Sequence, residues 1–121
     1  MPRVVHFEIN ADDPERAVNF YKKVFDWKIE SYGGPQEYWL AETGPATEMG
    51  INGAIMKRME KATTINTVGV DSLEAYMASV AKNGGKVLTE KMTIPSIGYF
   101  AYCQDTEGNP FGILQPDMSA K

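Results

Sequence analysis

The chain has 121 residues, of which 43% are hydrophobic and 23% charged, and its formal net charge is −4. This composition excludes an intrinsically disordered protein and predicts a single globular domain over residues 1–121. The acidic balance and the lack of a Lys/Arg cluster argue against nucleic-acid binding. The longest apolar run, 99–103, is far shorter than the roughly 20 residues that span a bilayer. The N-terminal residues also lack the apolar core of a signal peptide, so we expect a cytoplasmic protein.

The single cysteine and the single histidine limit the possible chemistry. Cys103 alone can form neither an internal disulfide nor a thiolate zinc cluster. No basic residue lies near it in the sequence, so we expect a small, buried, apolar side chain. Because His6 is the only histidine, a Ser-His-Asp arrangement is excluded everywhere except around position 6.

The first half of the chain shows the order strand, helix and three strands. Alternation predicts a strand over residues 5–9 that carries His6 and Glu8 on one face. Asp13 and Pro14 are typical of the N-cap and the first position of a helix, and an apolar stripe at helical spacing follows them. Turns rich in glycine and proline then separate three expected strands, at residues 27–30, 38–41 and 51–56.

The second half repeats this order. A strand rich in β-branched residues is expected at 63–70, followed by a helix with Asp71 as N-cap and Glu74 completing a variant of the capping box. The helix is expected to stop at 83–85, where an asparagine precedes two glycines. The remaining expected strands lie at residues 86–93, 98–104 and 109–115.

The repeated order predicts the α+β class, with two βαβββ modules at roughly 3–58 and 63–116. Each module has a four-stranded sheet but only one helix to cover it, so the other face of each sheet needs another cover. We therefore expect two cupped mixed sheets that enclose a concave, partly polar space, which is where small-molecule sites are common. His6 and Glu8 are expected to line this space.

Two segments resemble the vicinal oxygen chelate superfamily, which includes glyoxalase I, bleomycin resistance proteins and extradiol dioxygenases. They are the opening His6-Phe7-Glu8-Ile9 with the helix that follows, and the closing turn Asp105-Thr106-Glu107-Gly108 with its strand. The resemblance covers residues 3–116 and is strongest to a group related to lactoylglutathione lyase. It implies paired βαβββ modules, a homodimer, and in catalytic members a divalent metal held by four side chains.

Three of the four metal-binding positions implied by the resemblance carry no suitable side chain. His6 fills the first position, but Ile65 and Gly112 stand where a histidine and a glutamate would be expected. The strand at 51–56 offers neither a carboxylate nor a histidine. Most catalytic zinc sites have three protein ligands, so we expect no metal and no other cofactor. A rearranged metal site that uses His6 and Glu8 stays open as an alternative.

His6 and Glu8 are the candidate catalytic residues. Either they form a structural hydrogen-bonded pair, or they act in proton transfer, since histidine titrates near neutral pH and a nearby carboxylate can fix its tautomer. Tyr38 and the predicted pocket-lining residues could supply aromatic or hydrogen-bonding walls, although strand alternation lets only about half of the strand aromatics face inward. The predicted pocket-lining residues are Trp39, Asn52, Tyr99 and Tyr102.

The preferred hypothesis is a glyoxalase/bleomycin-resistance-like protein that binds a small molecule without a complete metal site. The alternative is a lyase or isomerase related to lactoylglutathione lyase that uses His6 and Glu8, either without metal or at a rearranged metal site. The sequence leaves open whether the protein is an enzyme and whether the pocket lies within one chain or across a dimer.

Overall fold

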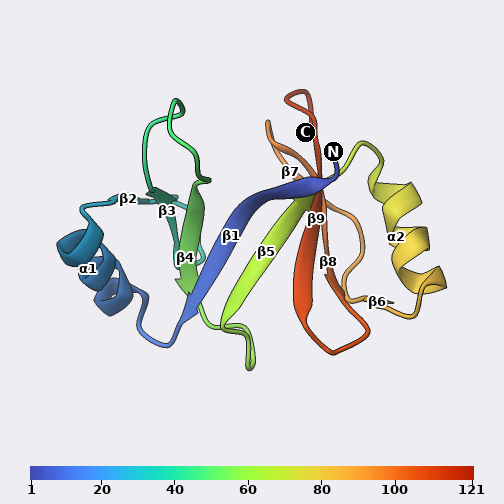
Figure 1. Cartoon of the computed structure of the whole chain (residues 1–121), viewed down its shortest axis with the longest axis horizontal. Coiled ribbons are helices and arrows are strands. Elements are labelled where there is room, and N and C mark those ends of the chain that lie inside the picture. Colours follow the sequence, from blue (N-terminus) through green and yellow to red (C-terminus); the bar gives the residue numbers. More distant parts are fainter. The chain divides into compact units, whose positions relative to one another are not determined.

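A computed structural model describes all 121 residues and divides them into two compact units. The N-terminal unit is His6–Ile65, and the C-terminal unit combines Met1–Val5 with Asn66–Lys121. Each unit has one helix and its own set of strands (Figure 1). No helix combines the length and the apolar character that crossing a membrane requires.

The N-terminal unit contains the predicted order of strand, helix and three strands. Its strands are ordered β2-β3-β4-β1, with β1 parallel to β4 and the other neighbours antiparallel. The elements are β1 (Arg3–Ala11, in this unit from His6 onward), α1 (Pro14–Phe25), β2 (Lys28–Ser31), β3 (Tyr38–Glu42) and β4 (Gly53–Lys57).

The ends of α1 follow from local chemistry. The carboxylate of Asp13 accepts a hydrogen bond from the backbone N–H of Arg16 at 3.2 Å, and Pro14 occupies the first helical position, as predicted. At the other end Asp26 adopts the left-handed conformation, with φ of 59°, and its N–H donates to the carbonyl of Lys22. The helix is thereby closed at both ends before β2 begins.

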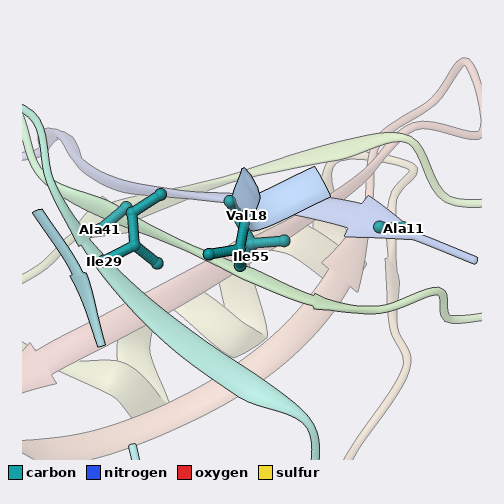
Figure 2. Close-up of a cluster of buried hydrophobic side chains, with 5 residues drawn as sticks. All are labelled: Ala11, Val18, Ile29, Ala41 and Ile55. Carbon is teal, nitrogen blue, oxygen red and sulfur yellow. The ribbon is translucent and has the colours of Figure 1, made fainter. Parts of the chain in front are cut away.

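The core of the N-terminal unit lies between α1 and one face of its strands. Val18 from the helix packs with Ile29, Ala41 and Ile55 from β2, β3 and β4, and Ala11 completes the buried cluster (Figure 2). Because successive side chains of a strand point to opposite faces, the residues between these core positions lie on the face away from α1.

The C-terminal unit contains the second set of elements. Its strands are ordered β5-β9-β8-β6, and β7 also pairs with β8. The elements are β5 (Thr64–Gly69, in this unit from Asn66 onward), α2 (Leu73–Lys82), β6 (Lys86–Val87), β7 (Met92–Ile94), β8 (Gly98–Gln104) and β9 (Pro110–Pro116). The helix α2 packs over a core that contains Leu73 and Cys103.

Cys103 is fully buried in this core, in line with the expectation of a small apolar side chain. Burial raises the pKa of its thiol, because the charged thiolate loses its hydration there. A buried thiol with a raised pKa is a poor nucleophile.

Two details differ from the sequence-based predictions. The N-cap of α2 is Ser72, whose hydroxyl accepts from the N–H of Ala75 at 3.3 Å, so the helix begins one residue later than a cap at Asp71 implies. The strand predicted over 86–93 is divided into β6 and β7. Between them the Thr89 hydroxyl, rather than a backbone carbonyl, accepts from the N–H of Tyr102 at 3.0 Å, so the regular ladder is interrupted.

Gly53 is required by the close approach of β4 to β1. A Cβ at this position would lie 2.5 Å from the carbonyl oxygen of Phe7 and 2.6 Å from its ring. We predict that Gly53→Ala lowers the free energy of unfolding by about 1–3 kcal/mol, the usual cost of overpacking. Chemical denaturation monitored by circular dichroism measures this change.

Gly44→Ala is the matched control, because the nearest atom to its added Cβ would be a flexible Glu48 oxygen at 4.0 Å. Its free energy of unfolding should stay within about 0.5 kcal/mol of the parent. Equal unfolding midpoints for the two variants would contradict the assigned contact between β4 and β1.

Candidate functional site

His6, Glu8 and Tyr38 form a polar cluster within the N-terminal unit, on the face of the strands away from α1. On β1, Ile9 and Ala11 pack toward the helix, which places His6 and Glu8 on the other face. On β3, the core position Ala41 likewise places Tyr38 on that other face. We call these three residues the polar trio.

The Tyr38 hydroxyl bridges the other two members of the polar trio. It donates a hydrogen bond to Oε2 of Glu8 at 2.7 Å and lies 3.0 Å from Nε2 of His6. Both distances are within the normal hydrogen-bonding range, and the first is that of a strong O–H···O contact.

The bridge depends on the strand that lies between β1 and β3. Glu8 is level with Ala54 of β4, and Ala54 is level with Leu40 of β3. Tyr38 itself is level with Met56 of β4, and its hydroxyl reaches Glu8 and His6 across β4, where neighbouring strands lie about 4.8 Å apart. Ala54, which is fully buried, presents only a methyl group on this face of β4.

Burial sets the electrostatics of the polar trio. Glu8 is only 5% exposed, and a buried carboxyl group is costly unless it is hydrogen-bonded. The pKa of His6 is lowered because burial disfavours its charged form, and the nearby Glu8 opposes this shift in part. His6 is therefore neutral at physiological pH and available as a hydrogen-bond acceptor or base.

An aromatic and an aliphatic side chain of the same unit lie close to the trio in the fold. The ring of Tyr32 contacts that of Tyr38 edge-on, with 6.0 Å between centroids, and 49% of Tyr32 is exposed. Leu40 shares the face of Tyr38 by alternation and is 44% exposed. An accessible apolar surface therefore adjoins the buried polar groups.

The predicted pocket-lining residues on β3 and β8 divide between the two faces of their sheets. Trp39 packs against the helix-side core of its unit, so Tyr38, not Trp39, is the aromatic residue that reaches His6 and Glu8. Tyr99 packs against the core beneath α2, and Nζ of Lys91 lies 4.5 Å from its ring centroid. Tyr102, three positions on, lies on the opposite face from Tyr99 and contacts Phe100 edge-on at 4.7 Å.

Asn52 has a structural role in the loop between β3 and β4. Its side-chain oxygen accepts from the backbone N–H of Thr43 at 2.9 Å. Asn52 also lines a hollow of about 90 Å³ formed by this loop, which does not include any member of the polar trio. Its role as a wall of a ligand pocket stays a prediction.

The residues at the metal positions that the resemblance implies do not fit a four-ligand centre. Ile65 is fully buried and offers no donor atom, and Gly112 has no side chain. A Cβ at Gly112 would lie 2.5 Å from the Phe100 ring, so a longer side chain here would require that ring to move. Nowhere in the chain do three His, Cys, Asp or Glu side chains gather in a way that could hold a metal.

The lowered pKa of His6 predicts how stability depends on pH. The unfolded chain takes up a proton at His6 near its ordinary pKa of 6.5, whereas the folded protein takes it up only at lower pH. The free energy of unfolding should therefore fall as the pH drops from about 7 to the folded pKa of His6. Urea denaturation at a series of pH values measures this slope.

The His6→Gln variant is the control for this measurement, because glutamine retains a hydrogen-bonding side chain and does not titrate. Between neutral pH and the onset of carboxylate protonation, the free energy of unfolding should change less steeply with pH in His6→Gln than in the parent. Parallel slopes for the two proteins would show that His6 is not held in a neutral, buried state.

Comparisons with known proteins agree with this architecture. A glyoxylase-like domain-containing protein of Didymella fabae is 34% identical over 112 residues, covering 88% of each chain. The candidate glyoxylase CFP32 of Mycobacterium bovis is 31% identical over 90% of this chain, which spans only 42% of that protein.

The structure of a variant of Streptomyces coelicolor methylmalonyl-CoA epimerase in complex with 2-nitronate-propionyl-CoA superimposes with a TM-score of 0.74. The match covers 100% of this chain and 99% of the epimerase at 13% identity, so it supports the fold alone. The sequence model of the Glyoxalase/Bleomycin resistance protein/Dioxygenase superfamily matches residues 3–113. The chain therefore belongs to the Glyoxalase/Bleomycin resistance protein/Dioxygenase superfamily, with the α+β fold expected from its repeated elements.

Proposed function

We propose that this protein binds a small molecule at the polar trio and does so without a metal ion. The observation that carries this proposal is the Tyr38 hydroxyl held between the buried carboxylate of Glu8 and the imidazole of His6. Buried polar clusters that contain groups with perturbed pKa values are common at ligand sites. The incomplete set of metal donors supports a role for hydrogen bonds in place of coordination.

The surroundings of the polar trio suggest the shape of the ligand. A polar group of the ligand would bind at His6, and a compact aromatic or carbonyl-bearing body would lie against Leu40 and Tyr32. These two side chains are each nearly half exposed, so contact with a ligand would remove apolar surface from water. The S. coelicolor epimerase is in complex with 2-nitronate-propionyl-CoA, which supports small-molecule binding by a protein of this fold.

The second candidate function is a metal-free lyase or isomerase. The lowered pKa of His6 favours this candidate, because a neutral imidazole can accept a proton from a substrate at physiological pH. A pH–rate profile with a limb that disappears in His6→Gln would distinguish catalysis from binding alone.

The binding proposal predicts ligand-dependent stabilisation in the absence of metal. In buffer with EDTA, a panel of small aromatic alcohols, carbonyl compounds and carboxylates should contain ligands that raise the melting temperature. At a free concentration of one hundred times Kd, a ligand stabilises the folded protein by about 2.7 kcal/mol. Differential scanning fluorimetry, followed by calorimetric titration of each compound found, measures this effect.

Tyr38→Phe should weaken binding of these ligands about tenfold, because the variant loses the hydroxyl that organises His6. Tyr76→Phe, which removes a hydroxyl from α2 in the other unit, should bind them like the parent. Stabilisation that occurs only after a divalent metal is added would contradict the proposal.

We also propose that the protein is a cytoplasmic homodimer. Phe20, Val24 and Phe25 of α1 are 55%, 54% and 55% exposed, and exposed apolar patches of this kind often mark interfaces.

Light scattering should give a mass of two chains for the parent and of one chain for Phe20→Ser. Leu88→Ser, which changes an exposed apolar residue of the other unit, should remain dimeric. A parent protein with the mass of one chain would disprove the dimer.

A further inference from the structure

The direction of the hydrogen bonds in the polar trio fixes the position of the imidazole proton. A tyrosine hydroxyl has one proton to donate, and a carboxylate can only accept. The short distance of 2.7 Å between Tyr38 and Glu8 is that of a hydroxyl donating to a carboxylate. The single proton of the Tyr38 hydroxyl is therefore used by Glu8.

In the hydrogen bond between Tyr38 and His6, the tyrosine oxygen must then be the acceptor. At 3.0 Å the two atoms are hydrogen-bonded, so Nε2 of His6 donates and the Tyr38 oxygen accepts. A neutral imidazole carries one N–H and one lone pair. With the proton on Nε2, the lone pair is on Nδ1.

We propose that Tyr38 is a positioning residue that holds His6 as the Nε2–H tautomer, so that Nδ1 is the hydrogen-bond acceptor offered to a ligand. Burial of His6 supports this arrangement, because it favours the neutral form of the ring. The arrangement resembles the use of a carboxylate to orient a catalytic histidine, with a tyrosine hydroxyl inserted between the two.

The tautomer selects a class of ligand, and this step rests on the binding function proposed above. A lone pair at Nδ1 is satisfied by a hydroxyl or N–H group of the ligand. An anionic group such as a carboxylate has no proton to give, and it would also be repelled by the buried Glu8 carboxylate. The site should therefore prefer neutral ligands that carry a hydrogen-bond donor.

The tautomer can be measured directly because the protein has one histidine. After ¹⁵N-histidine labelling, two-bond ¹H–¹⁵N correlation spectra at pH 8 in EDTA should show a protonated Nε2 and an unprotonated Nδ1. The Tyr38→Phe variant should shift toward a mixture of the two tautomers, while Tyr76→Phe should match the parent. A protonated Nδ1 in the parent, or an unchanged tautomer in Tyr38→Phe, would overturn the positioning role.

Three small aromatic probes test the preference for neutral donors, with the ¹⁵N resonance of His6 Nδ1 as the signal. Phenol should change the Nδ1 resonance at millimolar concentration, whereas anisole, which lacks the donor, and benzoate, which is anionic, should change it at least fivefold less. A response to benzoate equal to that to phenol would contradict the preference for neutral donors. If the tautomer is confirmed but no probe changes the resonance, the ligand class is wrong while the role of Tyr38 stands.

Discussion

The hydrogen bond from Tyr38 to Glu8 is the interaction on which the rest of the site depends. A carboxylate that is only 5% exposed must be compensated by donors, and the tyrosine hydroxyl is one of them. Once that proton is engaged, the hydroxyl oxygen can accept from His6, so one interaction places three side chains. Loss of the hydroxyl would leave the buried carboxylate less compensated and would free the imidazole ring to rotate.

The core beneath α1 makes this hydrogen bond possible. Val18 and its neighbours fix which face of β1 and β3 is turned to the helix, and a change of register by one residue would turn His6 and Glu8 toward it. Two small residues of β4, one glycine and one alanine, then limit the bulk between β4 and its neighbouring strands. Gly53 lets β4 approach Phe7, and the small side chain of Ala54 lies level with Glu8 of β1 and Leu40 of β3.

The two units differ in what they place at equivalent register positions. Glu8 is level with Ala54 and Leu40 in the N-terminal unit, and Thr67 is level with Gly112 and Tyr102 in the C-terminal unit. The three level residues of the N-terminal unit thus include a charged group, and the three of the C-terminal unit do not. The polar trio is built from hydrogen-bonding groups of the N-terminal unit alone.

The sequence alone determined the class of fold, the order of the elements, the cap of α1 and the shared face of His6 and Glu8, because these follow from local periodicity and capping chemistry. It also placed an isoleucine and a glycine, which cannot ligate a metal, at two positions where the family resemblance implies ligands. Only the tertiary structure chose Tyr38 over Trp39, because alternation leaves open which of two adjacent residues faces the helix. It also placed the break at Thr89, where a side chain from a distant part of the sequence competes for a backbone donor of β8. Contacts between residues far apart in the chain decided both features, and no local pattern encodes them.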